Sequence, residues 1–145
     1  MDRITQQKRS ANMAAVRSRD TKPEIIVRKI VHSLGYRFRL HEKSLPGTPD
    51  LVFTRKRKVI FVHGCFWHRH VGCSKASTPQ TRTDFWQQKF DANTARDERA
   101  IGNLEKTGWS VLVVWQCQLK DIKTLRNRLD DFLRIDVSAV GKIPK

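Results

Sequence analysis

The sequence predicts an α/β domain in which helices flank one mixed β-sheet. Segments with helical and strand periodicity follow one another in the order helix, three strands, helix, strand, helix. Two of the strand segments, 59–62 and 109–115, are almost continuously apolar, which is typical of strands buried on both faces. The chain has 145 residues, enough for one hydrophobic core with little room for a second. We therefore expect a single domain.

The first helix is predicted over residues 22–34. Thr21 and Glu24 have the spacing of a capping box, and Pro23 falls in the first turn, where its missing N–H costs nothing. Apolar residues then recur on one helical face, and Gly35 stands where a C-terminal cap belongs.

Three strand patterns follow this helix. Residues 36–41 alternate between aromatic or apolar and basic side chains, which predicts a half-buried strand. A loop at 42–49 leads to a short strand at 50–53, and a basic turn at 54–57 precedes the apolar strand 59–62.

The second half of the domain begins with an irregular stretch at 63–82 that is rich in His, Cys, Ser, Thr and Gly. Residues 83–107 are predicted as one long or two shorter helices that end at Gly108. The strand 109–115 has Trp109 and Trp115 at its ends, and both are assigned to the core. The last helix is defined by the apolar residues Ile122, Leu125, Leu129, Phe132 and Leu133.

These patterns divide the chain into three parts. Residues 1–20 form a basic N-terminal arm, with a short helix expected at 11–16, residues 21–135 form the domain, and residues 136–145 form an unpatterned tail.

The positive charge of the chain indicates a polyanionic partner. Lys and Arg number 29 against 14 Asp and Glu, so the formal net charge is +15 at pH 7. Fifteen of the basic residues and only five of the acidic ones lie in residues 1–58. Such a field attracts phosphate backbones and supplies sequence-independent affinity. Solubility alone is the alternative, but the pI of about 10.5 and the four tryptophans favour nucleic acid.

Composition and segment lengths exclude several classes of protein. With 39% hydrophobic residues, the chain is too apolar for a disordered basic tail. No run approaches the roughly 20 apolar residues of a membrane helix, and residues 1–13 lack the apolar centre of a secretory signal. Three cysteines without such a signal argue against a disulfide framework. We therefore expect a soluble, cytoplasmic protein with no membrane contact.

All three cysteines take part in a pattern that suits zinc. The candidate ligands are Cys65, His70, Cys73 and, just after the last strand, Cys117. Thiolates with an imidazole suit a closed tetrahedral Zn²⁺ site, which in small modules contributes on the order of 10 kcal/mol of folding free energy. Buried thiols without a metal are the alternative. On spacing alone, His63 and His68 are alternative nitrogen ligands.

A second metal position is predicted where two neighbouring strands meet. Asp50 precedes one strand, and Val62 and His63 end the next. Oxygen ligands at such a place suit a hard cation such as Mg²⁺, which activates water and stabilises charge on a phosphate. An ordinary Pro-Asp turn is the alternative.

Five motifs carry a resemblance to a known family. They are Lys8-Arg-Ser-x-x-Met13, Leu45-Pro-Gly-x-Pro-Asp50, Phe61-x-His-Gly-Cys-Phe-Trp-His68, Thr81-Arg-Thr-x-Phe-Trp86 and Val114-Trp-x-Cys117. Together they resemble the very-short-patch repair DNA mismatch endonucleases, over about residues 6–133. The resemblance implies a restriction-endonuclease-like, or PD-(D/E)xK-like, fold with a structural zinc loop. It also implies an enzyme that nicks one DNA strand 5′ of the thymine in T:G mismatches, which arise when 5-methylcytosine deaminates.

The resemblance implies a role for each residue of the catalytic centre. Asp50 would hold Mg²⁺ together with the backbone carbonyl of Val62, a position that is threonine in the best-known members. His68 would be the general base, His63 a second catalytic imidazole, and Glu24 and Asp97 part of the surrounding acidic shell. Zinc would be held by Cys65, His70, Cys73 and Cys117, although the loop between His70 and Cys73 is one residue longer than in the family. A shift of the zinc ligand to His68 would remove the base.

The same resemblance implies how DNA is held. The implied DNA-binding residues are Lys8, Arg9, Met13, Phe66, Trp67 and Trp86. Phe66, Trp67 and Met13 would wedge into the duplex beside the mismatch, where unstacking is less costly. Each role has a simpler alternative: Glu24 as a helix cap, Asp97 on a solvated helix face, and Met13, Phe66 and Trp67 in the core. Because Phe66 and Trp67 lie inside the loop between zinc ligands, we expect them to point outward and be exposed.

The prediction from sequence is a magnesium-dependent nicking endonuclease that acts as a monomer on double-stranded DNA with a T:G mismatch. Mismatch-repair proteins and a cognate DNA cytosine methyltransferase are implied partners, and the enzyme would be nucleoid-associated when bound to DNA. Two other functions suit the same residues: a zinc-stabilised, non-catalytic DNA-binding module, and a nuclease of the same fold with restriction-type or homing-type specificity.

Overall fold

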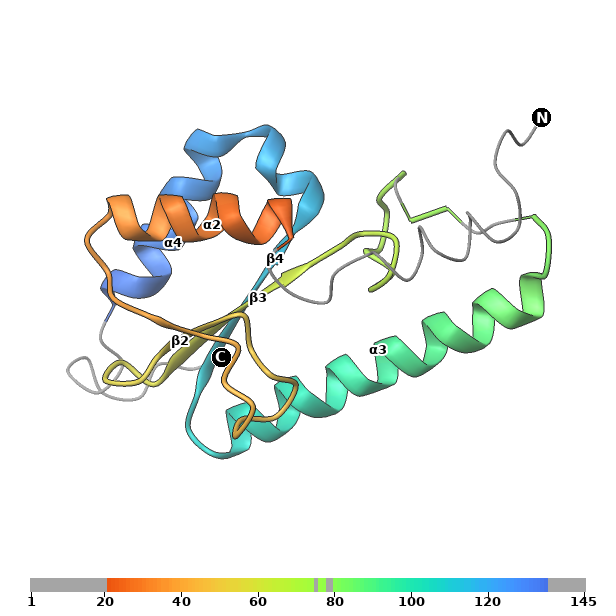
Figure 1. Cartoon of the computed structure of the whole chain (residues 1–145), viewed down its shortest axis with the longest axis horizontal. Helices are drawn as coiled ribbons and strands as arrows, with labels where there is room; N and C mark the ends of the chain where they lie inside the picture. Colours follow the sequence, from red (N-terminus) through yellow and green to blue (C-terminus); the bar gives the residue numbers. More distant parts are fainter. Residues whose placement is uncertain (1–20, 75, 78–79, 136–145) are drawn as a thin grey trace.

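The predicted order of helices and strands is confirmed by a computed structural model, which describes residues 21–74, 76–77 and 80–135 (Figure 1). The elements are α2 (Lys22–Ser33), β1 (Arg39–Leu40), β2 (Leu51–Phe53), β3 (Lys58–His63), α3 (Thr83–Lys106), β4 (Ser110–Trp115), the 3₁₀ turn η1 (Gln116–Lys120) and α4 (Ile122–Arg134). The arm at 1–20, with its expected helix at 11–16 and the residues Lys8, Arg9 and Met13, lies outside the described residues, as does the tail at 136–145.

The four strands form one mixed sheet in the order β1-β2-β3-β4. The pairs β1–β2 and β2–β3 are antiparallel, whereas β3 and β4 are parallel, as the crossover through α3 requires. In the parallel pair His63 is in register with Trp115, so both strands end at the same edge of the sheet.

The sheet separates two hydrophobic clusters, because successive side chains of a strand point to opposite faces. Helices α2 and α4 cover one face and α3 covers the other (Figure 1). The first cluster combines Val27, Ile30, Val31, Leu51, Phe53, Ile60, Val114, Leu125, Leu129 and Leu133. The second combines Val52, Val59, Phe61, Leu104 and Trp109.

The strand predicted at 36–41 is much shorter in the structure. Only Arg39 and Leu40 pair, because their partner β2 offers just three residues and the backbone of His41 turns to a φ of 49°. Tyr36 and Phe38 nevertheless pack against the first cluster, and the Tyr36 hydroxyl donates to Asp130 Oδ1 at 3.0 Å. The alternation therefore indicates the packing of Tyr36 and Phe38 correctly, but it overestimates strand length and the burial of Leu40, which is exposed.

The last strand is an edge strand, contrary to the expected burial on both faces. Among residues 21–74, 76–77 and 80–135, β4 pairs only with β3, and most of its residues are half-buried. Trp109 is buried as predicted, but Trp115 is only half-buried and lies beside the histidines at the end of β3.

Residues 83–106 form a single helix rather than two. The second half of α3 lies beside the sheet, and the first half continues beyond the ends of β3 and β4 (Figure 1). Ala100 and Leu104 are accordingly buried in the second half, whereas Phe90 is the buried residue of the first half.

The strand β3 begins one residue earlier than predicted, with the buried Lys58. Its ammonium group donates to the carbonyl oxygens of Phe132 and Ile135 at the end of α4. A cation at a helix C-terminus satisfies carbonyls that the helix leaves unpaired. This contact anchors the last helix to the central strand.

Within the described part of the chain, no helix is long and apolar enough to span a bilayer.

Candidate active site and metal centre

A cavity of about 690 Å³ opens where β3 ends. Its lining combines residues from α2, the start of β2, the end of β3, the following loop and α3. They include Glu24, Asp50, Val62, His63, Trp67, His68 and Asp97. All five side chains that the sequence assigns to the catalytic centre thus line one cavity, although they come from five segments of the chain.

The loop before β2 brings Asp50 into this cavity. Gly47 in this loop has a φ of +73°, and a Cβ there would lie 2.7 Å from the Cβ of Ala100 on α3. Glycine therefore permits both the left-handed turn and the close approach of the loop to α3. Asp50 follows three residues later and is held by the Val62 amide, which donates to its Oδ2 at 2.7 Å.

The environment of Asp50 favours its protonated form. Burial raises the pKa of this carboxyl to about 6, and the nearby Glu24 adds to the rise, while the hydrogen bond from Val62 opposes it. A cation beside Asp50 would offset the cost of burying its charge. The site therefore suits a cation chemically.

Glu24 is buried at the start of α2 with two cationic or polar neighbours. The Thr21 hydroxyl accepts a hydrogen bond from the Glu24 amide at 3.4 Å, as the predicted cap requires. The Glu24 carboxylate accepts a hydrogen bond from Arg28 Nη2 at 2.6 Å and contacts His41 Nε2. Ligand atoms of Glu24, His41 and Asp50 lie within 4.8 Å of one another. Sequence reasoning missed His41, since no motif includes it; its one signal is that it ends the segment directly before the Asp50 loop.

The two histidines of the site stack on each other. The rings of His63 and His68 are 3.9 Å apart between centroids and 6° from parallel. Burial lowers the pKa of His63 to about 4, with His68 contributing in the same direction, so His63 is uncharged at neutral pH.

Asp97 reaches this pair from the middle of α3. Its Oδ2 lies 2.6 Å from Nδ1 of His68, and about a quarter of the side chain is exposed. The simpler alternative for Asp97, a solvated helix face, is therefore wrong, because the packing of α3 turns this residue toward the loop after β3.

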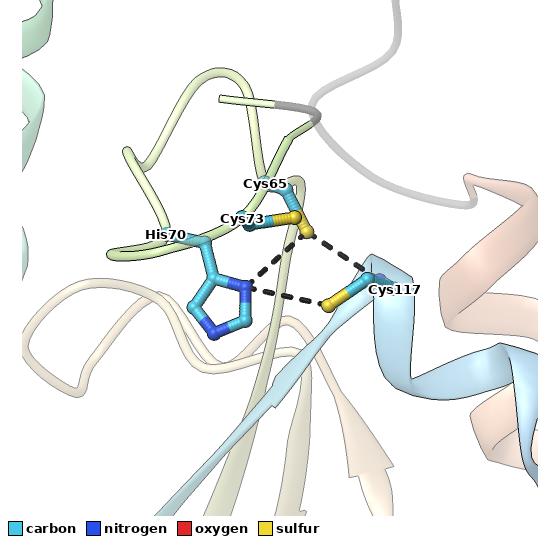
Figure 2. Close-up of side chains that lie close together, drawn as sticks. All are labelled: Cys65, His70, Cys73 and Cys117. Atoms are coloured by element: carbon cyan, nitrogen blue, oxygen red, sulfur yellow. Dashed lines mark hydrogen bonds between the residues drawn. The ribbon is translucent and has the colours of Figure 1, made fainter. Parts of the chain in front are cut away.

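The three cysteines and His70 come together beside the ends of β3 and β4 (Figure 2). His70 Nδ1 lies 3.7 Å from Cys65 Sγ and 3.3 Å from Cys117 Sγ, and all four ligand atoms are within 4.8 Å of one another. Neither His63 nor His68 belongs to this group, since both take part in the stacked pair.

The donor set of this cluster fits Zn²⁺. Three sulfur atoms and one nitrogen match the ligands of closed tetrahedral sites. Burial raises the pKa of the Cys65 thiol to about 11, so a thiolate there needs a bound cation to offset its charge. A zinc ion would supply that charge.

The adjacent aromatic residues Phe66 and Trp67 are half-buried, and not exposed as expected. Phe66 packs edge-on against Trp67 at 5.0 Å and Phe90 at 5.2 Å between ring centroids, and Trp67 lies 5.8 Å from Trp86. The first half of α3 covers them because it continues beyond the sheet. Trp67 still lines the cavity beside His68.

Comparison with known proteins agrees with this geometry. The family described as DNA mismatch endonuclease Vsr matches residues 1–75. The chain is 52% identical over 132 residues to the type II nicking enzyme V.XorIIP of Xanthomonas oryzae pv. oryzae, covering 91% of this chain and 96% of that protein. It is 46% identical over 112 residues to the DNA mismatch endonuclease Vsr of Escherichia coli K12, covering 77% of this chain and 71% of that protein.

A solved structure shares the fold. The catalytic domain of the homing endonuclease I-Bth0305I superposes with a TM-score of 0.56 at 20% identity, covering 78% of this chain and 94% of that domain. The predicted restriction-endonuclease-like class is thereby confirmed. The chain belongs to the Vsr family of DNA mismatch endonucleases, a family that implies a divalent metal, and it is a DNA endonuclease.

Proposed function

We propose that this endonuclease nicks one strand 5′ of the thymine in T:G mismatches, in a magnesium-dependent reaction of very-short-patch repair. The observation that carries the proposal is the single cavity in which Asp50, His63 and His68 meet beside Trp67. The names of the relatives support it, since one is a mismatch endonuclease and another a nicking enzyme.

The magnesium ion would be held by the Asp50 carboxylate and the backbone carbonyl of Val62. Oxygen ligands are those that Mg²⁺ prefers, and because burial raises the pKa of Asp50, a bound cation would stabilise the ionised carboxylate. When bound, the ion supplies a positive charge that stabilises the phosphate during its displacement and increases the acidity of water.

His68 would act as the general base. If its Nδ1–H donates to Asp97, Nε2 keeps a lone pair that accepts the proton of the attacking water. Water forms its bond to phosphorus as the bond to the 3′ oxygen breaks, which leaves 5′-phosphate and 3′-hydroxyl ends. The uncharged His63 would support the His68 ring by stacking, and Glu24 would complete the acidic shell around Asp50.

DNA would be held by the positive charge of the chain and probed by its aromatic residues. Lys8 and Arg9 would contact phosphates. The residues proposed to enter or flank the duplex are Met13, Phe66, Trp67 and Trp86. Because Phe66 and Trp67 are half-buried against α3, wedging requires them to leave part of that packing, which a mismatch makes less costly.

The proposed partners and oligomeric state follow from the proposed substrate. T:G pairs arise by deamination of 5-methylcytosine, so a DNA cytosine methyltransferase and mismatch-repair proteins are the proposed partners. Nicking one strand requires a single copy of the active site, and we propose a monomer.

The decisive experiment is a nicking assay on labelled duplexes that differ only in one T:G or C:G pair. We expect a magnesium-dependent nick 5′ of the thymine and little cleavage of the matched duplex. Magnesium is omitted rather than chelated, so that the Cys/His cluster is not stripped at the same time. Asp50→Ala is expected to abolish nicking with unchanged zinc content. Equal cutting of the matched duplex would instead indicate restriction-type or homing-type specificity, and binding without cleavage would indicate a DNA-binding module.

A further inference from the structure

Trp115 lies between the cysteine cluster and the histidine pair. One face of its ring stacks on His70, with centroids 4.3 Å apart and an interplanar angle of 8°. The ring also meets His63 edge-on, at 5.3 Å and 75°. His63 in turn stacks on His68. A continuous row of four rings therefore joins a candidate zinc ligand to the candidate base.

The strand register explains why this row forms. His63 and Trp115 are paired at the ends of the parallel strands β3 and β4. Cys65 follows His63 by two residues, and Cys117 follows Trp115 by two residues. The Cys117 amide donates a hydrogen bond to Cys65 Sγ at 3.4 Å. The same two strand ends thus supply both metal ligands and rings of the active site.

The surroundings of His63 are aromatic on several sides. Phe61 lies 5.6 Å away between centroids, His68 3.9 Å and Trp115 5.3 Å, and His63 is 6% exposed. His68 is held by Asp97 on one side and by the His63 ring on another. Loss of the Trp115 ring would therefore remove one of the contacts that hold the His63 and His68 rings in place.

We propose that Trp115 is a positioning residue, which transmits the geometry of the cysteine cluster through His63 to His68. Coordination of a metal by His70 fixes the plane of its ring, the stacked Trp115 follows that plane, and the Trp115 edge confines His63. The inference rests on the proposed zinc site and on the proposed role of His68. It gives the zinc centre a second role beyond stabilising the fold, that of aligning the base.

The experiment compares Trp115→Leu and Trp115→Phe with a matched control, Trp109→Phe, at the residue directly before the same strand. Trp109 is buried in the second cluster and contacts Arg57, away from the cavity. Because misplacing a catalytic group costs about 10²-fold in rate, we expect Trp115→Leu to lower the single-turnover nicking rate by about 10- to 100-fold with little change in KM. Trp115→Phe keeps an aromatic ring and should restore most of the rate, and Trp109→Phe should lower Tm without changing the rate.

A second readout does not depend on activity. Zn²⁺ is replaced by the larger Cd²⁺, and the imidazole resonances of His63 and His68 are followed by NMR. We expect the exchange to shift the His63 resonances in the wild-type protein and in Trp115→Phe, and this shift to vanish in Trp115→Leu. If Trp115→Leu fails to fold or to hold metal, Trp115→Met replaces it as the variant without a ring. Loss of the His63 shift in Trp115→Met supports the inference, and a shift equal in size to that in Trp109→Phe overturns it.

The failure of this inference is distinguishable from failure of the proposed function. Normal nicking of T:G duplexes by Trp115→Leu, together with a His63 response to Cd²⁺ like that of the wild type, overturns the role of Trp115 alone. A wild-type protein that does not nick overturns the proposed function, while the NMR comparison still tests the link from the metal cluster to His63.

Discussion

His68 Nδ1 lies 2.6 Å from Asp97 Oδ2, which ties the loop after β3 to the middle of α3. A carboxylate in this position selects the tautomer of the imidazole and orients its ring. The two residues are 29 positions apart in sequence, so helix packing alone creates this pair.

We expect Asp97→Asn to slow nicking strongly, because the amide no longer stabilises the protonated His68 and permits the wrong tautomer. General acid–base catalysis contributes about 10²- to 10⁴-fold, and the variant should lose a large part of it. Single-turnover rates on a T:G duplex measure this effect. The neighbouring exposed Glu98 supplies the control, since Glu98→Gln should retain the wild-type rate. An unchanged rate in Asp97→Asn would show that Asp97 does not act through His68.

The Asp50 carboxylate is expected to destabilise the fold above its pKa. Burial raises the pKa of Asp50 to about 6 from an ordinary 3.8, so the unfolded chain loses this proton at lower pH than the folded protein. The contribution of Asp50 to stability is therefore greatest below pH 4, falls as the pH rises toward 6, and stays low at higher pH. Asp50→Asn removes the charge and should raise the free energy of unfolding at pH 8 by roughly 1–3 kcal/mol, in buffer without divalent cations.

Urea unfolding at pH 8 and pH 4 tests this sign. The gain should be much smaller at pH 4, where Asp50 is largely protonated in the folded protein and the pH is close to its pKa in the unfolded chain. Added Mg²⁺ should stabilise the wild-type protein and leave Asp50→Asn unaffected. A variant less stable than the wild type at pH 8 would mean that the Asp50 charge is already offset in the folded protein.

Loss of one cysteine should remove the zinc ion. Cys117→Ser replaces a thiolate by a poor ligand at the position that joins the cluster to the end of β4, so zinc content measured by atomic absorption should fall from one equivalent to near zero. Because metal binding and folding are coupled, Tm should fall as well. Cys73→Ser provides a second variant from the opposite side of the cluster. Full zinc content and unchanged Tm in both variants would contradict a four-ligand site.

His41 is expected to support magnesium binding through Glu24. His41→Ala removes one neighbour from the buried Glu24 carboxylate, which lies beside the proposed ligand Asp50, and residues that surround a metal ligand typically affect affinity about 10- to 100-fold. The concentration of Mg²⁺ needed for half-maximal nicking should rise accordingly. His41→Gln retains an N–H group and should restore part of the affinity. His32→Ala, at an exposed site in the last turn of α2, is the matched control, and an equal effect there would exclude a specific role for His41.

Much of the fold was predictable because its signals are local. The apolar runs of β3 and β4, the cap at Thr21 and the apolar spacing of α4 depend on neighbouring residues, and each leads to the observed element. Errors arose where a partner decides the outcome. β1 is short because β2 is short, and β4 is half-buried because nothing pairs with its outer side in the described part of the chain.

The candidate site likewise combines residues that the sequence marks locally with residues that only tertiary contacts bring to it. Spacing placed Cys65, His70 and Cys73 in one loop, but the choice of His70 over His63 and His68 required the stacking of the latter pair. No local signal marks His41, Asp97 was implied only by the family resemblance, and Trp115 was assigned to the core although it lies in a family motif. Each reaches it through a contact between segments far apart in sequence.

The order of the helices and strands, the positive charge and the residue types at two candidate metal positions follow from composition and short-range periodicity. Which imidazole meets the cysteines and which meets Asp97 depends on how the elements pack. The reason is physical: the register of β3 against β4 and the path of α3 across the sheet set the distances between these groups, and both depend on the packing of the whole domain.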